Sequence, residues 1–429
     1  MKTQKVIEIL RDYESRNVLF MEPDGSLPIV WERAKGVHVW DADGKKYLDL
    51  TAAFGVAAAG HANPNVVKAG QKQMAKLLHA MGDVHPHARK AELARELSRI
   101  TFERWTQNSK LMTGKTIFSN SGFEAVESAL KTAILATQKR SVIAFTGAYH
   151  GLGYGALNAT HRNFFRGPFQ SQLGQFGHFA PFPKKNPDLA AVEFQIRHFS
   201  RRERIGAILV EPVQARGGCN VPPGGFLPLL RKLCDELGAL LILDEIYTGF
   251  GRTGKWFACE HGDATPDIIC LGKALTGGFP LSACIGRADL MDAAWPASTG
   301  EAIHTSTFIG HPVGCAMALA QISEIKKLNL VERAARLGKF LLEELSQIKG
   351  PGFKVEARGL GLMAGLELKL PDGKPAGKAA IQTIKTLLQH GYIFLPEGEH
   401  GNVISFTPPL TITKSQLAKA AGALAEVLI

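Results

Sequence analysis

The chain has 429 residues, 45% of them hydrophobic and 21% charged, a composition typical of a large globular enzyme with more than one subdomain. The formal net charge is +11, but lysines and arginines occur as scattered pairs such as Arg201-Arg202 and never as a long basic run. This distribution disfavours nucleic-acid binding and favours a solvated basic surface. No apolar segment approaches the roughly 20 residues of a membrane span, so no membrane partner is expected.

The cysteines and the N-terminus indicate the compartment. None of the six cysteines forms a CxxC pair, so we expect buried free thiols in a reducing environment and no metal site. The N-terminus runs into charged residues without the apolar core of a signal peptide. A soluble cytoplasmic protein is therefore predicted.

The first third of the chain contains two recognisable elements. After a mixed segment, expected to form a helix and a loop, residues 37–50 predict a hairpin that turns at Asp43-Gly44. Residues 119–125, Ser-Asn-Ser-Gly-Phe-Glu-Ala, predict the start of a helix. The free N–H groups and positive dipole of such an end can bind a phosphate, although an ordinary helix cap has the same sequence.

The middle of the chain alternates strands and helices. Apolar runs at residues 141–145 and 206–210 predict buried strands. Between residues 226 and 237 leucines follow helical spacing, and Gly238 ends that predicted helix. This order favours a mostly parallel α/β sheet with right-handed connections.

Two further apolar runs each end in an ionisable residue. Residues 239–243 lead into Asp244, and residues 268–271 lead through Gly272 into Lys273. Open α/β sheets bind ligands at the carboxyl ends of their strands. Sites for pyridoxal 5′-phosphate (PLP) use a lysine for covalent attachment and an aspartate beside the ring nitrogen. Two ordinary strand ends, with a capping aspartate and a solvated lysine, would have the same pattern.

A nucleotide-binding loop is the other candidate in this region. Residues 249–255 approach the pattern GxxxxGK[ST], but Trp256 stands where a hydroxyl residue would hold Mg²⁺. The following residues lead towards Pro266 and do not open a helix directly. An ATPase is therefore disfavoured.

Three motifs in conserved order resemble one enzyme family. Residues 244–254 (DEIYTGFGRTG), residues 271–275 (LGKAL) and residues 304–312 (HTSTFIGHP) resemble the signature of class III aminotransferases. The resemblance implies a PLP-dependent transferase of fold type I, with a large domain whose mostly parallel sheet is flanked by helices. It also implies a smaller α+β domain from both chain ends: residues 1–65 and 321–429 around a large domain at 66–320.

The resemblance assigns roles to individual residues. Lys273 would carry PLP and act as general base and acid, while Asp244 would stabilise the protonated ring nitrogen. It implies a homodimer, because Thr307 would contact the neighbouring subunit's phosphate; His311 replaces the asparagine usual in that motif. The other cofactor contacts that it implies are Ser121, Gly122 and the Phe123 amide at the phosphate, Tyr149 and Ile246 on opposite ring faces, His150, Glu211 and Tyr247.

Substrate residues depart from the family pattern. Leu152 and Ser405 replace two carboxylate-binding arginines, Glu211 would lose its gating partner, and Phe54 would line the substrate mouth. Hence we expect an amine or ω-amino donor without an α-carboxylate and an oxo acid or aldehyde acceptor, unless Arg216, or Arg166 behind it, substitutes. Tyr247 stands where many relatives have glutamine. A racemase or aminomutase on the same scaffold remains the alternative, and a non-enzymatic PLP-binding protein is disfavoured by the intact Asp244 and Lys273.

Overall fold

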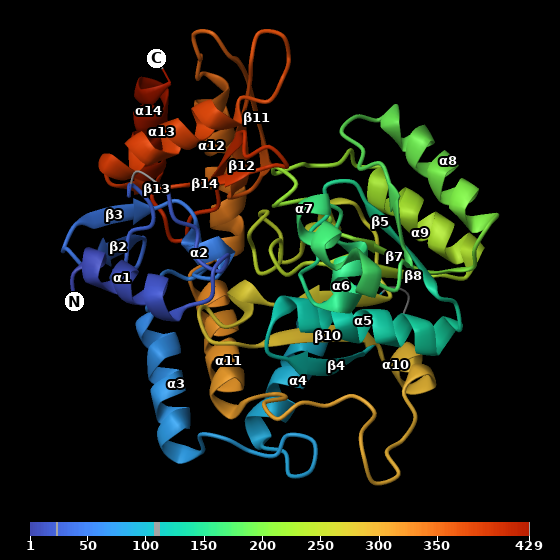
Figure 1. Ribbon diagram of the computed structural model, residues 1–429. Coiled ribbons are helices and arrows are strands. Elements are labelled where there is room, and N and C mark those ends of the chain that lie inside the picture. The colour runs from blue at the N-terminus through green and yellow to red at the C-terminus, as the bar shows by residue number, and fades with distance from the viewer. Residues whose placement is uncertain (23–24, 107–111, 429) are drawn as a thin grey trace.

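A seven-stranded sheet forms the centre of the protein in the computed structural model, which describes residues 1–22, 25–106 and 112–428 (Figure 1). Its strand order is β4-β10-β9-β8-β7-β5-β6. The five strands from β9 to β6 pair in parallel, while β10 runs antiparallel to both β4 and β9. The strands are β4 (Gly114–Ser119), β5 (Ser141–Phe145), β6 (Gly177–Ala180), β7 (Ile205–Val210), β8 (Leu240–Asp244), β9 (Ile268–Leu271) and β10 (Ser282–Arg287).

Helices cover both faces of this sheet because its strands are apolar on both sides. Along β8, Leu241 and Leu243 belong to one apolar core and Ile242 to the other, as the alternation of a strand requires. The helices of the large sheet and its surroundings are α3 (Pro64–Lys76), α4 (Ala88–Ile100), α5 (Gly122–Thr137), α6 (Tyr154–Ala159), α7 (Asn163–Arg166), α8 (Asp188–Ser200), α9 (Phe226–Leu237), α10 (Ala288–Ala294) and α11 (Pro312–Lys327). Three short 3₁₀ turns, η1 (Gly167–Gln172), η2 (Ala258–His261) and η3 (Lys273–Leu275), complete this part.

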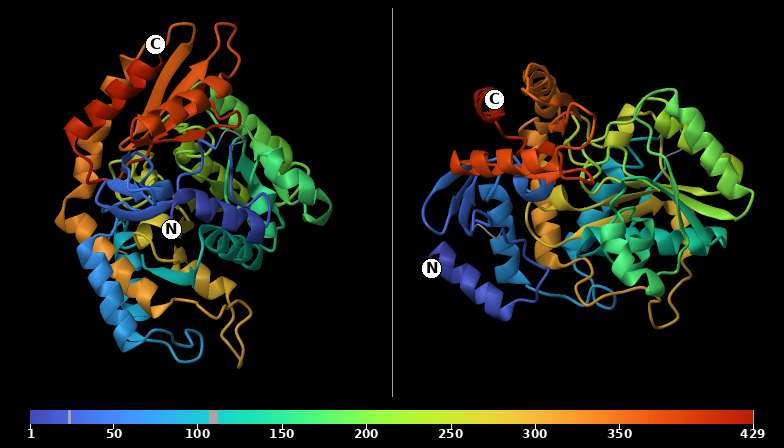
Figure 2. Two further views of the ribbon diagram at one scale, coloured as in Figure 1. Left: turned by 60° about the vertical axis from the view of Figure 1, so that its left-hand side comes forward. Right: turned by 45° about the horizontal axis from the view of Figure 1, so that its top comes forward.

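The two ends of the chain meet in a four-stranded sheet. Its order is β1-β2-β3-β13, and the last pair is parallel, with Leu48 opposite Tyr392. The N-terminal strands lie beside the C-terminal helices in both views of Figure 2. The elements are α1 (Thr3–Tyr13), β1 (Trp31–Lys35), β2 (His38–Asp41), β3 (Lys46–Asp49), α2 (Ala52–Gly55) and β13 (Tyr392–Ile393). The hairpin predicted at residues 37–50 is present as β2 and β3.

A third sheet follows α11. Its order is β11-β12-β15-β14, and all its pairs are antiparallel. Its elements are α12 (Leu330–Ser346), β11 (Lys354–Leu360), β12 (Met363–Lys369), α13 (Gly377–Gln389), β14 (Leu395–Glu397), β15 (Val403–Phe406) and α14 (Lys414–Val427). The boundary predicted at 320/321 falls within α11, so the chain leaves the large sheet along a continuous helix. The exact domain limits stay a prediction.

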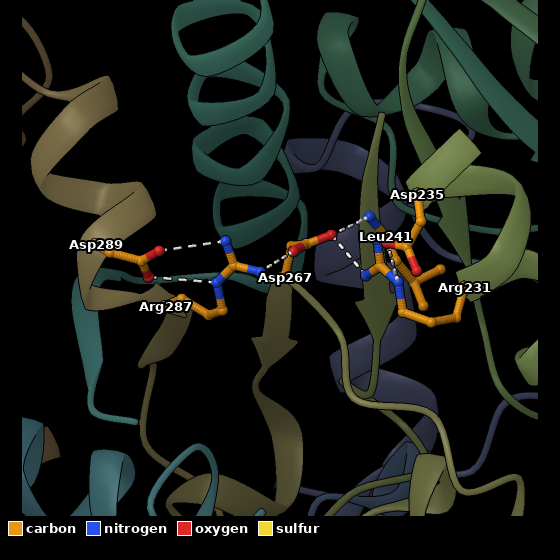
Figure 3. A network of polar contacts seen from close by, with 6 residues as sticks. All are labelled: Arg231, Asp235, Leu241, Asp267, Arg287 and Asp289. Atoms are coloured by element: carbon orange, nitrogen blue, oxygen red, sulfur yellow. Dashed lines mark hydrogen bonds and ion pairs between the residues drawn. The ribbon is translucent and has the colours of Figure 1, made fainter. Parts of the chain in front are cut away.

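Asp267 fixes the starts of β8 and β9 at the edge opposite their carboxyl ends (Figure 3). Its buried carboxylate accepts hydrogen bonds from the Leu241 amide at 2.8 Å and from the guanidinium groups of Arg231 and Arg287 at 2.7 and 2.8 Å. Arg231 comes from α9 and Arg287 from the end of β10. One carboxylate thus joins three strands and a helix, which fixes the relative positions of the two strands that lead to Asp244 and Lys273.

Candidate active site

The predicted pair of ionisable residues meets at the carboxyl edge of the large sheet. Asp244 is the last residue of β8, and it pairs with Cys270 of β9, three residues before Lys273. Both line a cavity of about 340 Å³. Its full lining is Gly122, Phe123, Tyr149, His150, Gly151, Leu152, Glu211, Arg216, Asp244, Ile246, Tyr247, Thr248 and Lys273. The adjacent parallel strands therefore bring together residues from five separate stretches of sequence.

Lys273 is held in a polar but largely desolvated position. Its Nζ lies 3.7 Å from the centroid of the Tyr247 ring, within the range of a cation–π contact. Burial lowers the pKa of its amine to about 8, although the charges of Asp244, Glu211 and Glu397 act in the opposite direction. A larger fraction of the amine is therefore unprotonated near neutral pH than in a free lysine.

His150 orients the carboxylate of Asp244. The His150 Nδ1 lies 2.8 Å from Asp244 Oδ2, and Asp244 Oδ1 accepts the Ile246 amide at 3.1 Å. Both side chains are buried, so the imidazole and the carboxylate hold each other in one geometry. The buried Nε2 of His150 has no hydrogen-bond partner among the described residues, which leaves a polar atom at the cavity wall.

The N-terminus of α5 forms a second wall. The Glu124 carboxylate accepts the Ser121 amide at 2.7 Å and the Ser121 hydroxyl at 2.9 Å, so this predicted helix start is confirmed. A Cβ at Gly122 would lie 3.0 Å from Ile246 Cδ1, and a Cβ at Gly151 only 2.3 Å from that of Phe123. Glycines at these positions let the loop, the helix end and Ile246 approach one another closely.

Glu211 acts on the backbone of this site. Its carboxylate, at the end of β7, accepts the amides of Tyr149 at 2.9 Å and Ala215 at 3.3 Å. Burial raises its pKa to about 7, with the Asp244 charge contributing in the same direction. The structure thus gives Glu211 a role in holding the Tyr149 loop, and among the described residues its carboxylate bonds to amides and not to an arginine.

Arg216 and Tyr149 lie against each other in the cavity. The Arg216 guanidinium carbon is 4.8 Å from the centroid of the Tyr149 ring. A buried acid that the sequence analysis did not single out, Glu397 of β14, lies 3.8 Å from Arg216 Nε. The only sequence signal for Glu397 is the segment Pro-Glu-Gly at residues 396–398, which carries no recognisable motif.

Five of the residues named as candidates from the sequence lie outside the cavity lining. Ser121 flanks the lining residue Gly122. Ser405 is buried in β15, where its hydroxyl donates to the Leu395 carbonyl at 3.0 Å. Phe54, on α2, is 49% exposed, and Thr307 lies exposed in a turn. Of the other arginine candidate, Arg166, the guanidinium carbon lies 4.8 Å from the Phe179 ring centroid, and Arg166 does not line the cavity.

The six cysteines are free and buried, so the prediction of unpaired thiols is confirmed. Within the described residues, no helix is both long and apolar enough to cross a membrane. In the same part of the chain, the histidine, cysteine, aspartate and glutamate side chains form no group that could hold a metal ion.

Comparisons with known proteins agree with this arrangement. A family model described as aminotransferase class-III matches residues 20–428. The acetylornithine aminotransferase of Methanosarcina mazei is 37% identical over 97% of this chain and 95% of its own length. The putrescine aminotransferase of Pectobacterium atrosepticum is also 37% identical, over 99% and 88%. The ornithine aminotransferase structure from Toxoplasma gondii, described with partial occupancy of PLP at its active site, superposes with a TM-score of 0.83 at 29% identity and covers 99% of this chain and 94% of its own.

Proposed function

Because the chain belongs to the class III aminotransferase family and is therefore an enzyme that transfers an amino group from an amine donor to an oxo acid, we propose that it does so with PLP bound around Lys273. One observation carries the proposal. The amine of Lys273 and the carboxylate of Asp244 line one cavity from adjacent parallel strand ends. These two groups are the ones a PLP site requires.

The residues of the cavity fit this cofactor. The helix N-terminus at Gly122 and Phe123 offers backbone amides to a phosphate, and Gly151 lets the neighbouring loop lie close. The Asp244 carboxylate, oriented by His150, would hold the protonated ring nitrogen. Tyr149 and Ile246 both line the cavity and would pack on the ring faces. When bound, PLP supplies an electron sink for a carbanion at the carbon that bears the amino group.

The chain's own groups move and hold the protons. Lys273 Nζ, with its lowered pKa, can act as general base by accepting a proton from a substrate carbon, and then as general acid by donating it again. The contact of 2.8 Å with His150 Nδ1 holds the Asp244 carboxylate in its orientation. Tyr149, whose backbone amide donates to Glu211, lines the cavity and would shield a bound ring from water on one face. Tyr247 confines the Lys273 amine from one side.

The role of Lys273 is tested by covalent trapping. Borohydride should fix PLP on the peptide that contains Lys273, and Lys273→Ala should abolish transamination. A Lys273→Ala protein with full transamination activity would contradict the assignment of Lys273 as the residue that carries PLP. An amine donor given alone separates the alternative classes, because a transaminase leaves its cofactor in the amine form and a racemase or aminomutase does not.

The donor and acceptor are also proposed. We propose an amine or ω-amino donor, supported by the replacement of two carboxylate-binding arginines by Leu152 and Ser405 and by the internal hydrogen bond of Ser405. The putrescine aminotransferase among the relatives is named for a diamine, which agrees with such a donor. The measurement is kcat/KM for a primary amine against the α-amino acid of matched side chain, in wild type and Ser405→Arg.

We further propose a homodimer with shared active sites and a cytoplasmic location. Thr307 lies exposed away from the cavity of its own chain, which suits a contact with a neighbour, and the buried free thiols suit a reducing compartment. Mixing Lys273→Ala with Thr307→Ala protein should restore activity, because one site of the mixed dimer is intact. A fully active monomer in dilute solution would contradict the shared site.

A further inference from the structure

Arg216 is fixed at its backbone by hydrogen bonds, and its side chain reaches the cavity. Its carbonyl oxygen accepts the Gly398 amide at 3.1 Å and a hydrogen bond from the Arg162 guanidinium. Its own side chain is 33% exposed and lines the cavity that contains Lys273. Of the lining residues, Arg216 and Lys273 are the arginine and lysine side chains within the described part of the chain. Arg216 is therefore the cation available to a substrate once Lys273 is engaged with the cofactor.

Glu397 balances the Arg216 charge without binding it tightly. Glu397 is 4% exposed, and its Oε2 lies 3.8 Å from Arg216 Nε. That distance is too long for a hydrogen bond, and both atoms are buried without a hydrogen-bond partner among the described residues. A buried ion pair usually has hydrogen bonds that offset the cost of desolvation. Arg216 Nε and Glu397 Oε2 lack such bonds, so the hydrogen-bonding capacity of these two atoms is unused.

Glu397 can also lose its charge. Burial raises the pKa of its carboxyl to about 7, while Arg216, Arg162 and Lys273 act in the opposite direction. Burial raises the pKa values of Tyr247, Tyr149 and Cys219, and the charge of Glu397 contributes in the same direction. A second carboxylate that approached Arg216 would be repelled by ionised Glu397 and would favour its protonation.

We infer that Arg216 and Glu397 form an exchangeable ion pair that recognises the carboxylate of the oxo-acid substrate. Glu397 balances Arg216 when a donor without a carboxylate occupies the cavity. When the oxo acid enters, its carboxylate takes the place of Glu397 on the guanidinium, with Arg162 adding positive charge behind it. This inference rests on the proposed function, because it explains how one cavity accepts an amine without an α-carboxylate and then an acid.

The test measures binding of an unreactive carboxylate. Butanoate and its neutral analogue butanamide are titrated into the PLP-loaded enzyme by calorimetry at several pH values. Replacing Arg216 with alanine should weaken butanoate binding about tenfold to a hundredfold and butanamide binding much less, because a charge-assisted hydrogen bond is lost. Arg216→Lys should recover part of the affinity. The matched control is the distant ion pair of Arg104 and Glu260, whose Arg104→Ala and Glu260→Gln variants should bind butanoate like wild type.

Proton linkage tests Glu397 separately. Near pH 8 butanoate binding to wild type should take up protons, seen as a dependence of the heat on buffer ionisation enthalpy, and affinity should fall as pH rises through about 7. Glu397→Gln should bind butanoate more tightly and should lose this proton uptake.

Two results would overturn the inference. One is undiminished butanoate binding by both Arg216 variants, and the other is unchanged proton uptake in Glu397→Gln. Conversion of the cofactor by an amine donor is recorded on the same samples. Its absence in wild type would reject the proposed function, whereas its presence together with either result rejects the ion pair alone.

Discussion

Lys273 combines a strained backbone with a desolvated amine. Its φ of +43° lies in the left-handed region, which costs a residue with a side chain about 1–2 kcal/mol. The strain occurs where the chain leaves β9 and enters η3, and the surrounding packing holds it. The motif LGKAL identifies this lysine from sequence, but its left-handed backbone and its contact with Tyr247 depend on tertiary packing and have no sequence signature.

The lowered pKa of Lys273 predicts unusual reactivity in the protein without cofactor. Reductive methylation requires an unprotonated amine, so labelling of Lys273 should reach its midpoint near pH 8. The control is Nα-acetyl-lysine, whose amine deprotonates near pH 10.4. Mass spectrometry of the Lys273 peptide measures the labelled fraction at each pH. Labelling that follows the control compound would contradict the desolvated environment.

The buried Glu245, next to Asp244, should make the free energy of unfolding depend on pH. Its fully buried carboxylate accepts the amides of Ala258 at 2.9 Å and Cys259 at 2.8 Å, yet burial raises its pKa to about 7. The folded state therefore binds more protons than the unfolded state between about pH 4.5 and 7. The stability contributed by this group is present at low pH and is lost as pH rises through about 7.

The measurement compares wild type with Glu245→Gln, which cannot ionise. As pH rises from 5 to 8, the free energy of unfolding of the variant should improve relative to wild type by at most about 3 kcal/mol. The exposed Glu332→Gln serves as control and should show no such trend. Parallel pH curves for wild type and Glu245→Gln would show that Glu245 is ionised throughout.

At the scale of elements, apolar runs predicted the strands on both sides of the site, and β5, β7, β8 and β9 are all present. The antiparallel strand β10 was not predicted, because its sequence Ser-Ala-Cys-Ile-Gly-Arg has few large apolar residues and a pattern does not reveal strand direction. The fold class and the positions of Asp244 and Lys273 therefore follow from sequence, whereas the mixed edge of the sheet follows from pairing with β4 and β9.

The hydrogen bonds and ion pairs of Asp267 should contribute to the free energy of unfolding of the large sheet. Asp267→Ala would leave the buried Leu241 amide without its acceptor and would remove one acceptor from each of the Arg231 and Arg287 guanidinium groups, so the free energy of unfolding should fall by about 2–4 kcal/mol. Urea unfolding followed by tryptophan fluorescence measures this. Asp235→Ala in the same network is the control, because that side chain is 66% exposed and its loss should change stability by less than about 1 kcal/mol. Equal losses in both variants would contradict the central role of Asp267.

At the scale of the whole molecule, the site is completed by residues distant in sequence. Glu397 approaches Arg216 from β14 although no motif marks it, and the contact depends on how the third sheet lies against the large one. Most of the residues that the resemblance implies for the cofactor line one cavity, because they lie at strand ends and at a helix end of one sheet, whereas Ser121 and Thr307 do not line it. It could not supply Glu397, because that pairing depends on packing between sheets.

Arg252 couples the large sheet to the C-terminal segment that follows α11. This buried arginine donates through Nη1 to the carbonyls of Leu362 at 3.0 Å and Pro408 at 2.5 Å, both beyond α11 in sequence. Arg252→Leu would leave these carbonyls unpaired, so calorimetric unfolding should shift to lower temperature and broaden or split as the parts lose cooperativity. Arg201→Leu, an exposed arginine, is the control. A single sharp transition at the wild-type temperature would show that other contacts couple the large sheet to the segment after α11.

The hydrogen bond from the Gly398 amide to the Arg216 carbonyl joins the third sheet to the cavity at the large sheet. This arrangement has a consequence for the evolution of substrate specificity. Asp244 ends one strand of the large sheet and Lys273 follows the next strand, whereas Glu397 and Ser405 lie on the third sheet. The inferred role of Glu397 therefore predicts that substitutions in the third sheet alter the preferred acid while the large sheet is left undisturbed. Enzymes that descend from one ancestor can then differ in substrate specificity while they share the same amino-transfer chemistry. A laboratory library confined to residues 395–405 should explore new substrates in the same way, with the cofactor machinery left whole.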